Sequence, residues 1–358
     1  MRCPTRILKK LFLNVLRPAM LPLVLLASWP ALADLSALAE EVERIDAQME
    51  GAIGVYIKRL SDGAEVKHGT DRDWYLASTT KVPLGIAVLQ LIEDGDVDLH
   101  HELELQDSDY VDGSGQLLLA QPGTRYSIDE LIQNSIEDSD STATDMLIRF
   151  IGEDEFNRHV QTRLVPEGLG RITTIVSVRH DSYSEVHSGA KRLSNADIME
   201  VRAASPNSAR YEALLSKLGV ADDEVKASSY DAAWEQYYEH GLNSGDLVAM
   251  GELLERLVQG EYLNEENTQR LLGYMKNVST GRSRLQAGFP DHAVFAHKTG
   301  TQVARACNVG IVNADTPDDA VVVATCAERY DALANAEQAF AALGKAMTDA
   351  GLVKADSN

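Results

Sequence analysis

The sequence predicts an α/β (α+β) fold: both ends of the mature chain build one antiparallel sheet, helices flank it, and an all-helical lobe is inserted between the two halves. Three observations lead to this expectation. Strand-like alternation appears near the start, over residues 51–68, and near the end, over residues 295–328. An amphipathic helical pattern flanks each region. Residues 100–275, between them, are rich in helical patterns and poor in strand patterns.

The first 33 residues are typical of a cleaved secretory signal peptide. Residues 1–18 are basic with no acidic residue, and the apolar run 19–33 is too short to span a bilayer. The run ends in Ala31-Leu32-Ala33, a small-x-small cleavage pattern; a retained N-terminal anchor is the alternative. We therefore expect cleavage after Ala33 and a periplasmic or secreted domain. Its expected parts are one domain over residues 34–358, with an α/β lobe over about 34–100 and 276–358 and a helical lobe over about 101–275.

The charge of the chain excludes several classes of partner. The formal net charge is −22, and removal of the five basic residues of the first segment leaves 28 Lys and Arg against 55 Asp and Glu, or −27. A field of this sign disfavours nucleic acids and anionic lipid surfaces, and an anionic substrate would need a local basic well. No histidine cluster or cofactor motif is apparent. We expect no metal, no organic cofactor, no integral membrane segment after cleavage, and a monomer.

The elements of the sheet can be placed in order. Residues 34–49 have apolar side chains at helical spacing, and residues 51–60 alternate as the first strand of a hairpin. Three further strand-like runs cover residues 295–301, 307–312 and 320–328. A helix over residues 331–352 closes the chain. Residues 178–232 have weak periodicity and many polar side chains, so we expect an elaborated loop region there.

Two cysteines remain after the first segment, Cys307 and Cys326, each in an expected strand. A hairpin centred near Thr316-Pro317 would place them opposite each other, which permits a disulfide in an oxidising compartment. Two small buried thiols are the alternative, and it is the one we favour from the sequence.

A Ser-x-x-Lys motif, Ser78 to Lys81, lies in the stretch DWYLASTTKVPLGIAVLQ. Pro83 lacks an N–H, which only the first turn of a helix tolerates, so we expect a helix that begins near Thr79. Ser78 then lies at the helix N-terminus, where the dipole stabilises negative charge. Lys81 lies on the same face, and a partly desolvated lysine can take the serine proton. Ser78 is therefore a candidate nucleophile; a polar helix start is the alternative.

A second Ser-x-x-Lys, Ser188 to Lys191, has none of this context. It contains Gly189, follows His187 and precedes no apolar helix. We expect a turn there without a chemical role.

The tripeptide Ser139-Asp140-Ser141 precedes a helical pattern marked by Met146 and Leu147. Either serine could simply cap that helix. In a functional interpretation, Ser139 is a proton shuttle to the leaving group, and Ser141 hydrogen-bonds the lysine and the substrate.

A third motif, Lys298-Thr299-Gly300-Thr301, lies on an expected strand. Gly300 lets a substrate backbone lie against the strand, and Lys298 and Thr299 can bind a carboxylate. The N–H of Thr301, with that of the candidate nucleophile, could form an oxyanion hole. Arg305 could add charge for the same carboxylate; a solvated arginine on an edge strand is the alternative.

These three motifs, in this order and in these settings, are the signature set of class A β-lactamases and penicillin-binding proteins. The chain resembles the class A serine β-lactamase family, including its D-alanyl-D-alanine peptidase-like relatives, over most of the mature chain. The resemblance implies a nucleophile that is acylated, a proton acceptor, a shuttle, two ligands for the substrate carboxylate and an oxyanion donor. By this resemblance Ser78 is the acylated nucleophile, Lys81 its proton acceptor and Ser139 the proton shuttle. Lys298 and Thr299 bind the substrate carboxylate, and Thr301 supplies an oxyanion donor.

Three positions depart from the family pattern. Ser141 stands where the family most often has Asn, and Gly113 stands near the place of the family's aromatic wall, with Tyr110 offset. The family's deacylation base is a Glu in an aromatic-Glu-x-x-Leu-Asn pattern. Residues 238–243, YEHGLN, match it, which makes Glu239 the expected base; the alternative is that Glu239 ends a helix. Glu185 is a weaker candidate for the same role.

Three functions follow from these patterns. We favour hydrolysis of β-lactams through a Ser78 acyl-enzyme. A D-alanyl-D-alanine carboxypeptidase, penicillin-binding protein or esterase on the same fold is the alternative, and a non-catalytic ligand-binding domain is the third. The expected partner is a small-molecule β-lactam or a peptidoglycan-like peptide.

Overall fold

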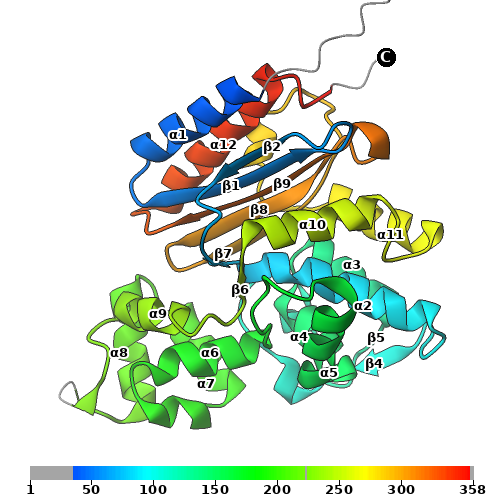
Figure 1. Cartoon of the computed structure of the whole chain (residues 1–358). Helices are drawn as coiled ribbons and strands as arrows, with labels where there is room; N and C mark the ends of the chain where they lie inside the picture. Colours follow the sequence, from blue (N-terminus) through cyan, green and yellow to red (C-terminus); the bar gives the residue numbers. More distant parts are fainter. Residues whose placement is uncertain (1–34, 222–223, 355–358) are drawn as a thin grey trace, which may run out of the picture. The chain divides into compact units, whose positions relative to one another are not determined.

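A five-stranded antiparallel sheet forms the centre of the fold in the computed structural model, which describes residues 35–221 and 224–354. The strand order is β2-β1-β9-β8-β7, so strands from the two ends of the described chain lie side by side (Figure 1). The predicted fold class is confirmed. The predicted signal peptide, residues 1–33, lies outside the described residues. The strands are β1 (Ala52–Arg59), β2 (Glu65–His68), β7 (Phe295–Gln302), β8 (Arg305–Val312) and β9 (Val321–Glu328).

Apolar side chains on the two faces of the sheet pack into separate clusters, as the period of two requires. Val321 and Val323 of β9 pack with helices α1 (Ser36–Gln48) and α12 (Leu333–Asp349). Val322 and Ala324 instead pack in the cluster that contains α10 (Leu247–Val258). Figure 1 shows α1 and α12 together on one face and α10 on the other. The sheet is therefore covered on both sides, and the two terminal helices form as the apolar spacing predicted.

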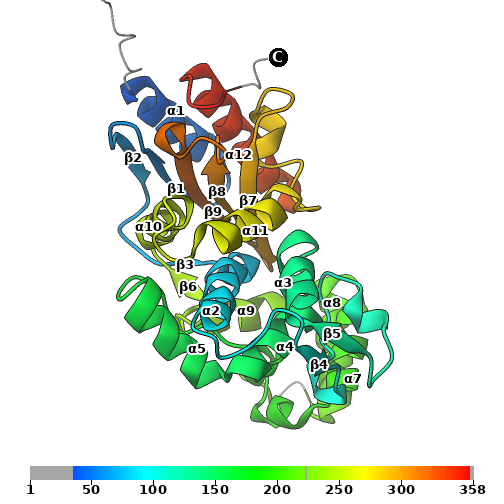
Figure 2. The ribbon, with the colours of Figure 1, turned by 90° about the vertical axis from the view of Figure 1, so that its right-hand side faces the viewer.

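Helix α2 (Lys81–Glu93) is the central helix of the second lobe. Every residue of Lys81–Gln90 is buried, which is the pattern of a helix enclosed on all sides. It contacts α3 (Ile128–Glu137), α4 (Ser141–Ile151), α5 (Glu153–His159) and α11 (Glu265–Lys276). Figure 2 shows α11 on its sheet side and α4 and α5 on the side away from the sheet. A small pair of strands, β4 (Glu102–Glu104) and β5 (Arg125–Ser127), precedes α3. The start of α2 is thereby held in a fixed position.

The four-helix segment, residues 175–238, corrects one prediction. We expected loops over residues 178–232, but the described residues form α6 (Ile175–Ser184), α7 (Asn195–Ala203), α8 (Asn207–Leu218) and α9 (Tyr230–Tyr238). Its buried cluster combines Tyr183, Tyr230 and Trp234 with aliphatic side chains. The helices are short, and some bury very few residues: α7 buries only Ile198 and Val201, and α8 only Leu214. The periodic signal was therefore weak.

Cys307 and Cys326 form a disulfide. They are directly opposite each other in the register of β8 and β9, as the predicted hairpin placed them. The preference for two free thiols was wrong, because pairing in register brings the two Cα atoms within 4.0 Å. No helix among residues 35–221 and 224–354 has both the length and the apolar character that a membrane crossing requires.

Candidate active site

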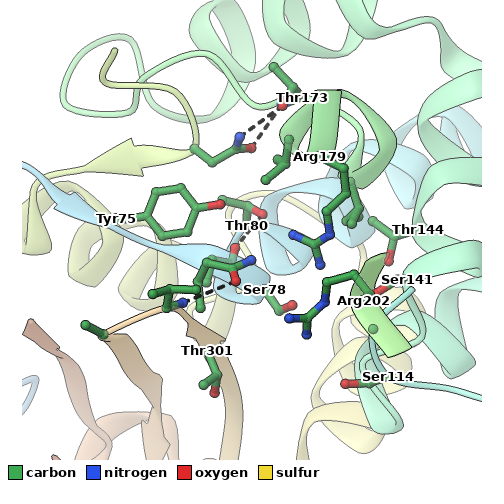
Figure 3. Close-up of a pocket in the computed structure, with 18 of the residues that line it drawn as sticks. Tyr75, Ser78, Thr80, Ser114, Ser141, Thr144, Thr173, Arg179, Arg202 and Thr301 are labelled. Atoms are coloured by element: carbon green, nitrogen blue, oxygen red, sulfur yellow. Dashed lines mark hydrogen bonds between the residues drawn. The ribbon is translucent and has the colours of Figure 1, made fainter. Parts of the chain in front are cut away.

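A cavity of about 1090 Å³ lies where the start of α2, the start of α4, the end of β7 and the four-helix segment meet. Four of the predicted site residues line it: Ser78, Lys81, Ser141 and Thr301. Figure 3 shows three of them, Ser78, Ser141 and Thr301, around the same space. Three separate motifs of the sequence therefore meet at one place.

Ser78 lies in a short 3₁₀ turn, Ala77–Thr80, that leads directly into α2. Ala77 has φ 49°, a left-handed conformation that is uncommon for a residue with a side chain. Such strain is held in place by surrounding structure and is frequent at functional sites. Pro83 falls in the first turn of α2, as predicted. Ser78 is partly exposed and lines the cavity, so its hydroxyl is accessible to a ligand.

The second Ser-x-x-Lys differs in placement. Ser188 and Lys191 lie in a short 3₁₀ helix, Ser188–Arg192, and do not line this cavity. Lys191 is largely exposed and pairs with Asp181. Neither residue of this second motif is therefore placed to act on a ligand in the cavity.

Lys81 is only 2% exposed, although it carries an ionisable amine. Burial lowers its pKa to about 8, and the nearby Asp140 and Asp145 carboxylates partly oppose that shift. Nζ donates to the carbonyl oxygen of Ser139 at 2.6 Å and lies 3.3 Å from Ser139 Oγ and from the carbonyl oxygen of Asp140. The amine of Lys81, the residue directly after the Ser78 turn, is therefore held against Ser139 and Asp140, with a pKa suited to proton transfer near neutral pH.

The turn before α4 is shaped by Asp140, which the sequence interpretation did not single out. Its carboxylate accepts the N–H of Ala143 at 2.9 Å and that of Leu117 at 2.9 Å, so Asp140, and neither serine, caps α4. Ser139 has φ 56°, a second left-handed residue in the site. The capped turn directs the Ser139 hydroxyl and carbonyl towards Lys81. The Ser-Asp-Ser motif is therefore a single structural unit.

The position of Gly113, beside the site, has no room for a larger residue. A Cβ at this position would lie 2.3 Å from Ser141 Oγ, and the backbone has φ +141°. Tyr110 does not replace the missing wall, because its hydroxyl donates to the carbonyl of Ala120 and its ring does not line the cavity. Gly113 therefore packs directly against Ser141 and leaves no room for a side chain between them.

Strand β7 runs directly beside the nucleophile turn. A Cβ on Gly300 would lie 2.5 Å from the carbonyl oxygen of Leu76 and 3.0 Å from the backbone nitrogen of Ser78. Only glycine permits this approach. Thr301, the next residue, is exposed to the cavity. The backbones of Ser78 and Thr301 are therefore close neighbours, as an oxyanion hole formed by their N–H groups requires.

Lys298 and Thr299 lie behind the cavity wall rather than in it. Lys298 is 0% exposed and donates to the carbonyl oxygen of Thr299 at 3.1 Å. Burial lowers its pKa well below the usual value, and the charges of Lys81 and Arg284 lower it further. Thr299 Oγ1 lies 2.6 Å from Thr280 Oγ1. Both residues are adjacent to the site, and a ligand must approach β7 closely to reach them.

Arg284 is a further residue that the motif search missed. It is almost fully buried and donates to the carbonyl oxygens of Gly300 at 2.9 Å and Cys307 at 2.7 Å, and to Thr301 Oγ1 at 2.5 Å. It thus ties the end of β7 to β8 beside the cavity. No periodic or motif signal marks it in the sequence, because its partners are distant backbone groups.

Arg305 and Glu239 do not lie where the sequence interpretation placed them. Arg305 does not line the cavity; its guanidinium pairs with Glu235 at 2.9 Å and lies 4.3 Å from the ring centre of Tyr238. Glu239 is exposed at the C-terminus of α9 and is also absent from the cavity lining. The alternative in which Glu239 ends a helix describes its position. Glu185, the other candidate, pairs with His240 instead.

Asn243, the last residue of the same pattern, does reach the cavity. Its side chain accepts the N–H of Thr173 at 3.0 Å and donates to Thr173 Oγ1 at 2.9 Å (Figure 3). Nearby, Asp145 accepts the N–H groups of Ile175 and Val176 and joins α4 to the start of α6. Burial raises the pKa of Asp145 to about 7. These contacts fix the start of the four-helix segment against the site.

The four-helix segment supplies two arginines that the sequence interpretation did not anticipate. Arg179 of α6 and Arg202 of α7 both line the cavity and hold Asp112 between them. Among the described residues no group of three or more His, Cys, Asp or Glu side chains is arranged to hold a metal ion. The charged side chains that line the cavity include Lys81, Arg179 and Arg202.

Comparison with known proteins agrees with this geometry. The beta-lactamase enzyme family model matches residues 37–350. Beta-lactamase OXY-2 of Klebsiella oxytoca is 21% identical over 277 residues, 77% of this chain and 76% of that protein. The extended-spectrum beta-lactamase PER-1 of Pseudomonas aeruginosa is 22% identical over 302 residues, 84% of this chain and 80% of that protein.

Solved structures show the same fold at low identity. PBP-A superposes with a TM-score of 0.64 at 22% identity, covering 88% of this chain and 96% of that one. A mutant of PBP-A, solved as an acyl-enzyme complex with penicillin G, gives a TM-score of 0.65 at 21% identity, covering 90% and 99%. With a family model that spans nearly all of the described residues, the chain belongs to the beta-lactamase enzyme family, as a distant homologue of the class A enzymes.

Proposed function

We propose that this protein is a serine hydrolase that forms an acyl-enzyme at Ser78 with β-lactams and with peptides that end in D-alanyl-D-alanine. One observation carries the proposal. Lys81 is buried next to the Ser78 turn with a pKa of about 8 and is hydrogen-bonded to Ser139. A buried lysine with so low a pKa is costly to keep and is a marker of proton-transfer chemistry.

The proposed acylation assigns a role to each group. Neutral Lys81 takes the proton of Ser78 while Oγ attacks the carbonyl carbon of the substrate. The N–H groups of Ser78 and Thr301 stabilise the oxyanion, which the N-terminus of α2 also favours. Ser139 returns the proton to the leaving nitrogen. The acyl group then remains on Ser78 as an ester.

Substrate binding is assigned to β7 and the start of α4. Lys298 and Thr299 bind the carboxylate of the substrate, and Ser141 hydrogen-bonds its amide. A carboxylate next to Lys298 would raise the pKa of this lysine, which is lowered in the free protein mainly by burial.

The rate at which the acyl group leaves Ser78 distinguishes a penicillin-binding peptidase from a β-lactamase. Glu239, the expected deacylation base, is exposed and does not line the cavity. This placement favours a penicillin-binding peptidase, in which a β-lactam leaves a long-lived ester. Hydrolysis of β-lactams with rapid turnover, the function that we favoured from the sequence, requires another group to activate water at Ser78. The likeness to named β-lactamases keeps it as the second candidate.

One experiment tests both forms. Purified protein is mixed with a fluorescent penicillin, and the label on the protein is followed over time, with Ser78→Ala as the control. The peptidase form predicts a label that persists for many minutes, together with release of D-alanine from a D-alanyl-D-alanine peptide. Rapid loss of the label with turnover of a chromogenic cephalosporin would establish the β-lactamase form. Absence of any Ser78 adduct would refute the proposal and leave a non-catalytic ligand-binding domain.

We further propose that the protein acts as a monomer in the periplasm or outside the cell. The basic, apolar and small-residue pattern of residues 1–33 supports this location. The Cys307–Cys326 disulfide is also typical of an oxidising compartment.

A further inference from the structure

Two arginines of the four-helix segment share one carboxylate at the cavity. The Asp112 carboxylate accepts hydrogen bonds from Nε and Nη2 of Arg179, at 2.7 and 3.0 Å. It accepts a third from Nε of Arg202, at 2.6 Å. Despite burial, the two guanidinium groups hold the pKa of Asp112 below its usual value, so its carboxylate is ionised at neutral pH. The cluster of Arg179, Arg202 and Asp112 therefore carries a net charge of about +1.

Part of this charge has no partner. Arg179 is 4% exposed and lines the cavity, yet its Nη1 is buried without a hydrogen-bond partner. A buried guanidinium donor left unpaired is costly, because it has lost its water and gained nothing in return. Arg202 engages only Nε among the described residues, so its two terminal nitrogens are free to bind a ligand. The cavity thus presents the two terminal nitrogens of Arg202, while the enclosed Nη1 of Arg179 lacks a hydrogen-bond partner and its guanidinium lies 5.5 Å from the ring centre of Trp234.

The position of these donors is separate from the β7 carboxylate site. Figure 3 shows the guanidinium groups of Arg179 and Arg202 on the four-helix side of the cavity, pointing into the same space as Ser78, while Thr301 of β7 lies apart from them. Gly113, next to Asp112 in the chain, lines the same cavity and packs directly against Ser141. A ligand held at Ser78 would therefore lie between the arginine pair on one side and the end of β7 on the other.

We propose that Arg179 and Arg202 form a second anion subsite that binds a carboxylate on the acyl side of the substrate. This inference rests on the proposed acylation of Ser78. The substrate class is then a dianion: one carboxylate lies at Lys298 on the leaving-group side, and the other lies at the arginine pair on the side that stays attached to Ser78. A guanidinium with two free donors suits a planar carboxylate, and the strongly negative chain needs such a local basic well to attract a dianion.

Two penicillins differ by only the group in question. Benzylpenicillin has one carboxylate, and α-carboxybenzylpenicillin has a second carboxylate on its acyl side chain. The second-order rate constant of acylation is measured for each by intact-mass spectrometry at low and high salt. We expect the dianion to react faster by about tenfold or more at low salt, as one charge-assisted contact allows, and the advantage to shrink at high salt. Equal rates, or a slower dianion, would overturn the subsite.

The variant Arg202→Gln isolates the contact, because this side chain is about one quarter exposed and makes a single bond, whereas Arg179 is enclosed. We expect it to remove the preference for the dianion, measured as the ratio of the two acylation rate constants within each variant, and Arg202→Lys to restore part of that ratio. The matched control is Arg149→Gln. Arg149 also holds an aspartate, Asp109, at 2.7 and 2.9 Å, but it does not line the cavity. The control should keep the full preference.

Failure of the subsite can be distinguished from failure of the proposed function. If benzylpenicillin acylates the protein and the dianion has no advantage, only the subsite is refuted. If neither penicillin acylates the protein, a binding measurement tests the subsite by itself. Phenylmalonate and phenylacetate, the acids that correspond to the two penicillin side chains, are compared by ligand-observed NMR. Tighter binding of phenylmalonate that is lost in Arg202→Gln supports the subsite without catalysis. Equal binding of the two acids, or the same preference in the variant, refutes it.

Discussion

The rate of acylation should follow the protonation of Lys81. Burial lowers the pKa of Lys81 to about 8, and the charges of Asp140 and Asp145 keep it from falling further. Only the neutral amine can accept the Ser78 proton. With a pKa of about 8, roughly 1% of the lysine is neutral at pH 6 and about half at pH 8. The second-order rate constant of acylation should therefore rise about fiftyfold between these two values and then level off.

The assay measures acylation of the protein by benzylpenicillin at low substrate, where the rate constant reports the pKa values of the free enzyme. Fluorescent penicillin competition or intact-mass spectrometry gives the rate at each pH from 6 to 9.5. A lysine with an ordinary pKa would instead give a rate that rises about tenfold per pH unit up to pH 10. A rise of that form, or a flat profile, would refute the assignment of Lys81 as the base.

A variant adds a directional check. Asp145 raises the pKa of Lys81, so Asp145→Asn should move the rising limb of the profile to lower pH. Asp94→Asn, which removes a carboxylate that pairs with Arg163 at the exposed end of α2, should leave the limb in place. Thermal unfolding of both variants shows whether they remain folded. A limb that moves to higher pH in Asp145→Asn would contradict the electrostatic account.

Three further outcomes are expected. Gly300→Ala should lower the acylation rate by about a hundredfold, because its Cβ would meet the Ser78 turn, whereas Gly273→Ala, with open space around it, should leave the rate unchanged; stopped-flow acylation checks both. Replacing Cys307 and Cys326 together by Ala should lower the free energy of unfolding by about 3 kcal/mol in urea titration, and an unchanged midpoint would argue against the disulfide. Glu239→Gln should leave the lifetime of the penicillin adduct unchanged, because Glu239 is exposed away from the cavity; a lifetime that lengthens would restore it as the deacylation base.

Much of the fold could be predicted because the relevant signals are local. The strands have period-two alternation, and the terminal helices have apolar stripes, so the sheet built from both ends follows directly. The four-helix segment could not be predicted in the same way. Its core joins Tyr183 of α6 to Tyr230 and Trp234 of α9, and contacts between separate helices leave no period in the sequence. The disulfide depended on the register of β8 and β9, which spacing alone suggested but did not decide.

In the candidate site, too, residues marked by local sequence signals could be predicted, and residues that depend on long-range contacts could not. Motif spacing pointed to Ser78, Lys81 and Thr301, and the structure brings the three residues to one cavity; their chemical roles stay predictions. Glu239 was misplaced because a six-residue match said nothing about where α9 ends. Arg305 was misplaced because its ion pair with Glu235 spans 70 residues.

The residues that were missed altogether act over long distances in the chain. Arg179 meets Asp112 across 67 residues, and Arg202 meets it across 90. Asp140 caps α4 locally but also holds Leu117, 23 residues earlier. Only the folded chain brings these partners together, so no pattern in the sequence could have assigned them to the cavity.

The most direct test of the central claim is the mass of the intact protein after exposure to benzylpenicillin, followed by peptide mapping. The account predicts one covalent adduct per chain, located on Ser78, absent from Ser78→Ala, and persistent for many minutes because Glu239 is not at the site. An unmodified protein, or an adduct on another residue, would contradict it.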